Sequence, residues 1–442
     1  MRISPAQARI RLPGPRALAH ALKASIVLMV VLALGVPLGI GTPRAMADPA
    51  PKPVAGPHEP ANAAEARMSL KLDKRLRNRA LGTDVTIAVL DEATNRLIVN
   101  RGATVPQLPA SNMKVITAVA ALAALGPNRR FSTRVLAGSR PNEVILQGGG
   151  DPLLTDRDLR RLARLTAARL PRGRTIVLRI DDHLFAGPLR APGWPRSYLG
   201  SVAAPVRSLA RLGDYSTANQ ARAVAVFRRA LARRGFTVVL RSGRRAPVDA
   251  RVLAQVSRHD VRRAVKLMLS ESENNVAEVL FRHVALASGE PGTWAGGRQA
   301  VTSLLATLGF DTTRLRLMDG SGLSRANRVT ALALAQLARL SRLDPRFATM
   351  YERGAMPVSG RSGTLDDRYG RYSTKPSRCA RGKIRAKTGT LFDTVGLTGI
   401  TIGGDGQEKS FAILVNHRPQ RVSTLTTRRA VDGLAATING CW

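Results

Sequence analysis

Two pairs of apolar segments, one near each end of the chain, have the pattern of β-hairpins. From Val85 to Val99 apolar and polar residues alternate around a polar turn at Glu92–Asn95. Near the other end, Gly396–Ile402 and Ser410–Asn416 are apolar runs joined through a Gly-Gly-Asp-Gly sequence. Alternation with a period of two, and turns rich in Gly and Asp, indicate paired antiparallel strands. We therefore expect one sheet that is built from both ends of the chain.

Most of the remaining apolar pattern has helical spacing. Ser111–Leu125 is nearly all small and apolar, which predicts a buried helix. Val261–Val284 and Thr330–Leu343 are predicted to be further helices.

Between these helices, one segment alternates helix and strand patterns. Residues 156–170 and 218–234 are amphipathic, and each precedes a short β-rich run, Thr175–Ile180 and Phe236–Leu240. Such alternation predicts a small α/β unit between about residues 141 and 255.

The first 47 residues have the composition of an export signal. They hold six basic and no acidic residues, an apolar run from Ala24 to Gly41, and an Ala-Met-Ala sequence that predicts cleavage after Ala47. The alternative is an uncleaved anchor, although the run is short for a membrane span and Pro37 interrupts it. Residues 48–66 are rich in Pro and Ala and are predicted to be a linker. The protein is thus expected outside the cytoplasm, at the cell wall, the outer face of the membrane or the periplasm.

Basic residues dominate the 442-residue chain, with 69 Lys and Arg, 30 Asp and Glu, and a formal net charge of +39. Removal of residues 1–47 would leave +33. This charge predicts attraction to anionic wall polymers or a membrane surface, although an Arg-favouring genome explains it equally well. With only 4 % aromatic residues, stacking on bases is a poor explanation, so no specific nucleic-acid binding is expected. No HxH, HExxH or CxxC spacing occurs, so neither a metal nor another cofactor is expected.

Three short elements carry residues suited to nucleophilic catalysis. At a helix start, Ser111 and Lys114 are three positions apart and share a face, so the amine lies beside the hydroxyl. A lysine that is desolvated near another cation can have a pKa low enough to take the serine proton. Alone, this S-x-x-K element is also compatible with a helix start and a snorkelling lysine.

The second element is Ser272-Glu273-Asn274, where polar residues interrupt an amphipathic helical stretch. Buried polar groups need partners, although a solvated helix–helix turn explains the same pattern. The third element is Lys387-Thr388-Gly389-Thr390, at the end of a short β-like run. A strand carrying a Lys, a hydroxyl and a Gly that lets a ligand approach the backbone suits binding of a carboxylate.

In this order, the three elements resemble those of the penicillin-binding proteins and serine β-lactamases. Further stretches resemble the class C low-molecular-mass penicillin-binding proteins, which are D-Ala-D-Ala carboxypeptidases and endopeptidases. These stretches are Gly148–Pro152, Asp181–Phe185, Pro192–Trp194, Asp319–Arg325, Asn327–Thr330 and Gly363–Leu365. The resemblance covers nearly all of residues 70–420. The middle element of the family is usually S-D-N, and Glu273 departs from it at the variable position.

The resemblance implies an α/β (α+β) fold: a penicillin-binding-protein/β-lactamase-like transpeptidase domain, with helices on both faces of an antiparallel sheet. We expect this domain to comprise residues 67–140 and 256–442, with a small α/β domain inserted at 141–255. Only 161 residues separate Ser111 from Ser272, fewer than in the larger family members, so one inserted domain is expected instead of two.

The resemblance also implies an exported serine D-Ala-D-Ala carboxypeptidase, with possible DD-endopeptidase activity, that forms an acyl-enzyme with peptidoglycan stem peptides. Ser111 would attack the penultimate D-alanine carbonyl, with Lys114 as its general base. β-Lactam antibiotics would inhibit it by acylating Ser111.

The other motif residues take supporting roles by the same resemblance. Ser272 would pass a proton to the leaving amine, with Lys387 tuning it electrostatically. Asn274 would hold the substrate amide, and Thr388 the terminal carboxylate beside Gly389. The backbone N–H groups of Ser111 and Thr390 would form the oxyanion hole.

Two cysteines, Cys379 and Cys441, are the only ones in the chain. In an exported protein they are expected to form a disulfide that pins the C-terminus to the segment before Lys387.

Two other functions remain compatible with the sequence. A β-lactamase-like hydrolase uses the same serine chemistry, but it normally lacks an inserted domain. A non-catalytic cell-wall-binding or scaffold protein would have no need of both Ser-Lys pairs.

Overall fold

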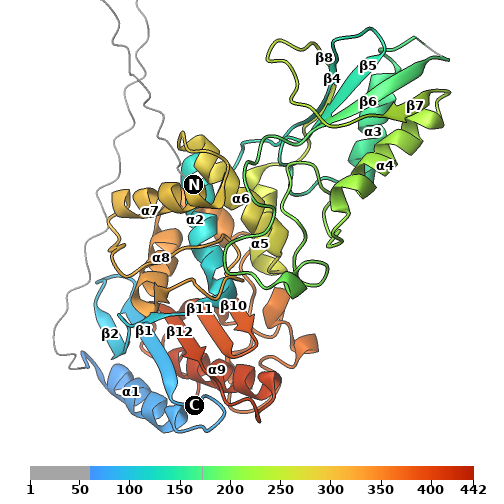
Figure 1. The fold of residues 1–442 in the computed structure, drawn as a ribbon. Helices are drawn as coiled ribbons and strands as arrows, with labels where there is room; N and C mark the ends of the chain where they lie inside the picture. The colour runs from blue at the N-terminus through green and yellow to red at the C-terminus, as the bar shows by residue number, and fades with distance from the viewer. Residues whose placement is uncertain (1–59, 172) are drawn as a thin grey trace, which may run out of the picture. The chain divides into compact units, whose positions relative to one another are not determined.

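The computed structural model describes residues 60–171 and 173–442 of the chain (Figure 1). The expected export signal at 1–47 and most of the expected linker at 48–66 lie outside the described residues. The first helix, α1, begins at Ala63, within the segment predicted to be linker. None of the helices in the described part has the length and apolar character needed to cross a membrane.

The central sheet is assembled from both ends of the chain, as the hairpin patterns predicted. Its five strands have the order β10-β11-β12-β1-β2, and every neighbouring pair is antiparallel. The two ends meet where β1 pairs with β12, with Leu90 opposite Ser410. The strands are β1 (Asp84–Asp91), β2 (Leu97–Arg101), β10 (Ile384–Leu391), β11 (Thr394–Ile402) and β12 (Glu408–Asn416).

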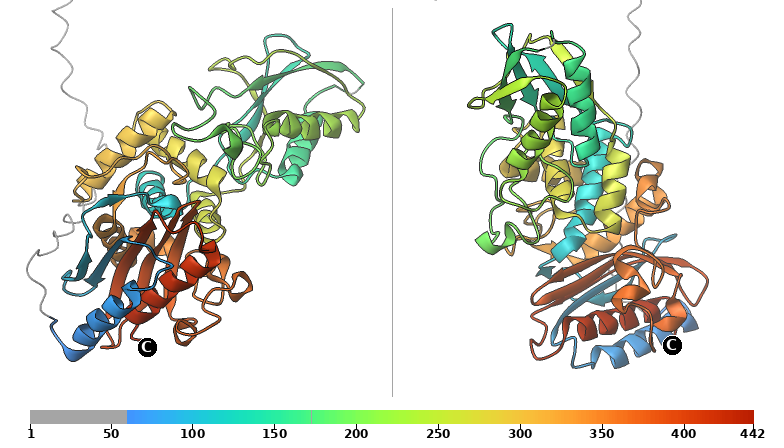
Figure 2. Two further views of the ribbon diagram at one scale, coloured as in Figure 1. Left: turned by 60° about the horizontal axis from the view of Figure 1, so that its bottom comes forward. Right: turned by 90° about the vertical axis from the view of Figure 1, so that its right-hand side faces the viewer.

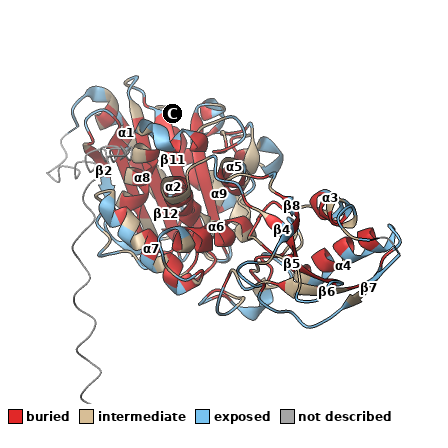
Figure 3. Ribbon diagram, turned by 90° about the horizontal axis from the view of Figure 1, so that it is seen from above, coloured by how far each residue is buried: buried red, intermediate tan, exposed pale blue. Residues whose placement is uncertain are grey.

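Helices cover both faces of this sheet because its strands are apolar on both sides (Figure 2). Along β1, Ile87 and Val89 point to one face, where they pack with α1 (Ala63–Leu76) and α9 (Thr424–Ile438). The alternate residues Ala88 and Leu90 belong to the larger core on the other face. That core contains α2 (Met113–Leu125), α5 (Val261–Ser270), α6 (Asn274–Ala287), α7 (Trp294–Thr307) and α8 (Ala331–Leu343). Seen from above, buried residues are concentrated in the strands and in these helices (Figure 3).

Helix α2 lies at the centre of the larger core, which confirms the predicted buried helix. Ala110–Asn112 form a short 3-10 turn, and α2 continues from Met113 until Gly126, whose positive φ of 71° ends the helix. Its small side chains let α5, α6 and α8 pack closely around it. The predicted helical stretch 261–284 forms two helices, α5 and α6, separated by Glu271–Glu273.

A second five-stranded sheet lies between α2 and α5 in sequence, with the order β7-β6-β5-β4-β8. Strands β5, β6 and β7 are parallel, and β4 pairs antiparallel with β5 and β8. The elements are β4 (Thr133–Ala137), β5 (Glu143–Gln147), α3 (Asp156–Ala167), β6 (Thr175–Asp181), α4 (Asn219–Ala232), β7 (Thr237–Leu240) and β8 (Val252–Val256). Since β4 precedes residue 141, this sheet begins before the predicted boundary, which falls between two of its strands. A small ladder of β3 (Pro106–Gln107) and β9 (Val329–Thr330) completes the strands of the described residues.

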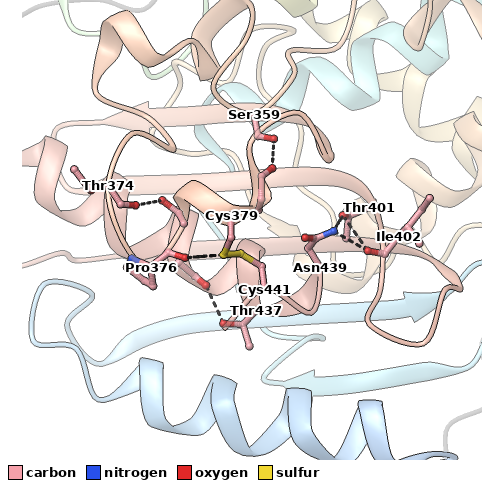
Figure 4. Close-up of a disulfide and its surroundings, with 12 residues drawn as sticks. Ser359, Thr374, Pro376, Cys379, Thr401, Ile402, Thr437, Asn439 and Cys441 are labelled. Atoms are coloured by element: carbon pink, nitrogen blue, oxygen red, sulfur yellow. Dashed lines mark hydrogen bonds between the residues drawn. A yellow bond between two sulfur atoms is a disulfide. The ribbon is translucent and has the colours of Figure 1, made fainter.

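The expected disulfide between Cys379 and Cys441 is present (Figure 4). It joins the loop before β10 to the residues after α9. Asn439, just after α9, is also bonded to the end of β11, because its Nδ2 donates to the carbonyl oxygen of Ile402 at 2.8 Å.

Candidate active site

Ser111 and Lys114 lie together at the start of α2. Lys114 is fully buried, and its Nζ is 3.0 Å from Ser111 Oγ. Two further acceptors fix the amine: Asn274 Oδ1 and the Ser321 carbonyl oxygen, each at 2.8 Å. The first predicted element is therefore assembled with the second.

Burial lowers the pKa of Lys114 from 10.5 to about 8, because the charged ammonium loses its hydration. The negative charges of Glu278, Asp319 and Glu273 act in the opposite direction and limit this decrease. A substantial fraction of Lys114 is thus the neutral amine near pH 8, the form that accepts a proton.

Ser272 and Lys387 form a second hydroxyl–amine pair. Lys387 lies on β10, an edge strand of the central sheet. Its Nζ donates to Ser272 Oγ at 2.9 Å and to the Thr388 carbonyl oxygen at 2.8 Å. Burial, aided by the positive charge of Lys114, holds the pKa of Lys387 well below its usual value. Ser272 has φ 61°, a left-handed conformation that is unusual for a serine and that is found mainly at constrained sites.

Asn274 connects the two pairs to a loop of the 141–255 segment. It is the first residue of α6, and while its Oδ1 accepts from Lys114, its Nδ2 donates to the Val202 carbonyl oxygen at 2.8 Å. The neighbouring Glu273 accepts a hydrogen bond from the Tyr215 hydroxyl. Glu273 is half-buried, and desolvation raises its pKa.

The third predicted element, on β10, packs against the segment that carries Ser111. A side chain at Gly389 would place its Cβ 2.5 Å from Asn112 Nδ2 and 2.8 Å from the Pro109 carbonyl oxygen. Close packing therefore explains why a glycine occupies position 389, in addition to the predicted approach of a ligand. Thr388 Oγ1 is 2.7 Å from Thr364 Oγ1. Thr390 Oγ1 accepts from Arg428 at 3.2 Å.

Two buried acids, Glu278 and Asp319, support Lys114, and the sequence analysis assigned no role to either of them. Glu278 is fully buried in α6 and accepts from Trp294 Nε1 at 2.8 Å and from the backbone N–H groups of Gly320 and Ser321 at 3.1 and 2.8 Å. These bonds fix the loop whose Ser321 carbonyl oxygen holds Lys114. Burial raises the pKa of Glu278, and the nearby charge of Asp319 contributes to the increase.

Asp319 organises the same loop from its other side. It accepts from Trp194 Nε1 at 2.7 Å, from Asn327 Nδ2 at 2.8 Å and from two backbone N–H groups. Gly322 has φ 85°, and a Cβ there would lie 1.8 Å from the Ala110 carbonyl oxygen. The loop thus contacts the turn that presents Ser111. The Asp-Gly-Ser-Gly spacing and the position of Glu278, one helical turn after Asn274, were the available sequence signals.

Comparison with known proteins identifies the family. The model of the D-Ala-D-Ala carboxypeptidase 3 (S13) family matches residues 68–212 and 199–438. The chain belongs to this family. It is accordingly a serine-type D-Ala-D-Ala carboxypeptidase.

Relatives of this S13 carboxypeptidase include the carboxypeptidase DacB of Mycolicibacterium smegmatis, 33 % identical over 399 residues that cover 85 % of this chain and 84 % of the relative. The D-alanyl-D-alanine carboxypeptidase of Actinomadura sp. is 28 % identical and covers 78 % of this chain and 80 % of its own. Penicillin-binding protein 4 (dacB) of Haemophilus influenzae has the same fold, with a TM-score of 0.71 and 21 % identity, over 84 % of this chain and 99 % of that one. These similarities confirm the predicted family and fold class.

Proposed function

We propose that Ser111 is the nucleophile of this carboxypeptidase and that its substrates are peptidoglycan stem peptides ending in D-Ala-D-Ala. The Ser111 Oγ–carbonyl bond forms as the serine proton passes to Lys114. The C–N bond to the terminal D-alanine then breaks, and the leaving amine takes a proton. Water hydrolyses the resulting ester, which restores Ser111 and completes the exchange of an amide for a carboxylate.

The observation that carries this proposal is the position of the Lys114 amine, which is fully buried, 3.0 Å from Ser111 Oγ and lowered in pKa to about 8. A serine hydroxyl needs a neighbouring base, and a desolvated lysine provides one near neutral pH. A cell-wall-binding protein without catalysis has no need for a lysine held in this state.

The other motif residues are proposed to bind the substrate and stabilise charge. Ser272, next to Lys387, passes the proton to the leaving amine. Asn274 holds a substrate amide, and Thr388 holds the terminal carboxylate. The backbone N–H groups of Ser111 and Thr390 stabilise the oxyanion, an interaction that contributes about 2.7–4 kcal/mol per donor in related chemistry.

Several broader properties belong to the same proposal. The enzyme works outside the cytoplasm after removal of residues 1–47. The segment that carries the second sheet, residues 133–256, is an insert in its catalytic domain. β-Lactam antibiotics acylate Ser111 because they present a reactive carbonyl in place of the peptide. The solved structure of a predatory peptidoglycan endopeptidase from Bdellovibrio bacteriovorus has a related fold, with a TM-score of 0.53 and 16 % identity. Endopeptidase activity on cross-linked stem peptides is therefore included in the test.

The decisive experiment combines intact-mass measurement with product analysis. Benzylpenicillin is expected to add one penicilloyl unit to the wild-type protein and none to Ser111→Ala, with Ser303→Ala, an exposed serine on α7, as the serine control. Wild-type protein should release D-alanine from a pentapeptide, and Ser111→Ala should not. Labelling that persists in Ser111→Ala would exclude Ser111 as the nucleophile.

The same samples separate the alternatives. Rapid nitrocefin turnover without D-alanine release would favour a β-lactamase-like hydrolase. Absence of both labelling and D-alanine release in a folded wild-type protein would favour a non-catalytic wall-binding protein. Cleavage of a cross-linked dimer of stem peptides would add the endopeptidase activity.

A further inference from the structure

A cavity of about 680 Å³ lies between α1, α9 and the segment Thr374–Pro376. Helices α1 and α9 pack against each other on one face of the central sheet (Figures 1 and 2). Helix α2, whose first turn follows Ser111, belongs to the core on the other face. The cavity is therefore separate from the candidate active site.

Six cationic side chains line this cavity, and no acidic side chain does. They are Lys71, Lys74, Arg75, Arg77, Lys375 and Arg429. Among the described residues, none of the six lies within ion-pair distance of a carboxylate. The acids nearby are already engaged, since Asp73 pairs with Arg101 and the buried Asp432 pairs with Arg371.

The cations on α1 are close to one another without a compensating charge. Lys71 is three positions before Lys74 and four before Arg75, spacings at which like charges repel on a helix. The helix dipole favours basic residues in the last turn of α1, but it does not account for Lys375 and Arg429 from other elements. Arg75 Nε is buried and has no hydrogen-bond partner, and desolvation lowers the pKa of this guanidinium.

The walls of the cavity are held in place by covalent structure. The Cys379–Cys441 disulfide connects the residues that follow Thr374–Pro376 to the end of the chain (Figure 4). Trp442, the next residue, also lines the cavity. Gly433, in the interior of α9, leaves room on the floor: a Cβ there would be 3.3 Å from Pro376 Cγ and 3.7 Å from Arg75 Nη1. Glycine is unfavourable inside a helix, so this close packing gives a reason for its presence.

We propose that this cavity binds the phosphate groups of an anionic polymer composed of polyol-phosphate or sugar-phosphate repeats. Phosphate oxygens would accept from the guanidinium groups in paired hydrogen bonds and from the lysines as point charges. The hydroxyls of Thr374 and Thr426 add uncharged donors. The concave shape favours a chain of discrete groups over a flat membrane surface. Binding would hold the enzyme on a wall polymer with its active site unobstructed.

The test is isothermal titration of the full chain with soluble poly(glycerol phosphate). The comparison probes are poly-glutamate, dextran and phosphatidylglycerol vesicles. The binding variant is Lys71→Gln/Lys375→Gln, which removes one cation from each of two walls. The matched control is Arg228→Gln/Arg233→Gln, which removes two exposed cations from the region of α4. We expect the binding variant to bind poly(glycerol phosphate) about tenfold more weakly or worse, and the control to bind as wild type does.

Folding is monitored independently by circular dichroism, which neither double variant is expected to change. If Lys71→Gln/Lys375→Gln folds poorly, Lys74→Gln/Arg77→Gln replaces it, because both of these side chains are exposed. Equal losses in the binding variant and the control would overturn the proposal, since net charge alone would then explain the affinity. Poly-glutamate binding equal to that of poly(glycerol phosphate) would overturn the phosphate assignment. Binding only to phosphatidylglycerol vesicles, or to none of these probes, would also overturn it.

Discussion

The pH dependence of acylation is the sharpest prediction from the site, because it follows from the state of one buried amine. Burial lowers the pKa of Lys114 from 10.5 to about 8. At pH 7, an amine with a pKa of about 8 is about 9 % neutral, whereas an ordinary lysine is about 0.03 % neutral. The folded site thus enriches the proton-accepting form about 300-fold, equivalent to about 3 kcal/mol.

The acylation rate should therefore rise with pH as Lys114 loses its proton. Between pH 6 and pH 9 the neutral fraction increases about 90-fold, and the second-order rate of benzylpenicillin acylation should increase with it, with a midpoint near pH 8. The rate is measured by labelling with a fluorescent penicillin, and circular dichroism at each pH checks the fold.

A charge-removing variant tests the electrostatic cause. The carboxylate of Glu273 raises the pKa of Lys114, so Glu273→Gln should move the midpoint to lower pH, while the amide oxygen still accepts from Tyr215. Glu271→Gln is the matched control, because Glu271 is exposed and lies two residues earlier. A midpoint that moves to higher pH in Glu273→Gln would refute the reasoning. A rate that is constant between pH 6 and pH 9 would remove Lys114 as the base.

Three further predictions concern other buried charges. Lys387→Ala should slow penicillin acylation about 10- to 100-fold, because a charge-assisted contact is lost. Lys387→Arg should retain part of the rate. An unchanged rate in folded Lys387→Ala would show that the third element was misread. Glu278→Ala leaves three buried donors unpaired and should lower the free energy of unfolding in urea by about 3 kcal/mol or more, with a smaller loss in Glu278→Gln. Asp432→Ala leaves the buried Arg371 without its partner and should lower the free energy of unfolding by about 3–5 kcal/mol. The apolar double variant Arg371→Met/Asp432→Leu should recover most of that loss. An unchanged free energy of unfolding in urea for Asp432→Ala would contradict the pairing.

The central sheet was predictable because each of its two hairpins has a local sequence pattern. Alternation around the turn at Glu92–Asn95, and the Gly-Gly-Asp-Gly sequence at 403–406, indicate strands and turns without reference to the rest of the chain. The extent of the second sheet was not predictable in the same way. Strand β4 pairs with β8, more than a hundred residues later, and no local pattern reports such a partner. Helix α9 was also missed, because its Thr residues and Gly433 are poor helix formers that tertiary packing overrides.

The residues of the candidate site were predictable, but the backbone conformation and the buried acids that hold them in place were only partly so. Spacing on a helix is sufficient to bring Ser111 and Lys114 together, since positions i and i+3 share a face. The left-handed backbone of Ser272 could not be predicted from its residue type, because it results from the break between α5 and α6. Glu278 looked like an ordinary acid on an amphipathic helix. Only the fold shows that it is fully buried and holds the Ser321 loop.

The 141–255 segment contributes to the candidate site through three separate contacts. The Val202 carbonyl oxygen accepts from Asn274, and the Tyr215 hydroxyl donates to Glu273. Trp194 Nε1 donates to Asp319. Asn274 holds Lys114 directly, and the charges of Glu273 and Asp319 raise the pKa of Lys114. Residues far from Lys114 in sequence are therefore, in physical terms, part of the scaffold that sets the geometry and the pKa of the Lys114 amine.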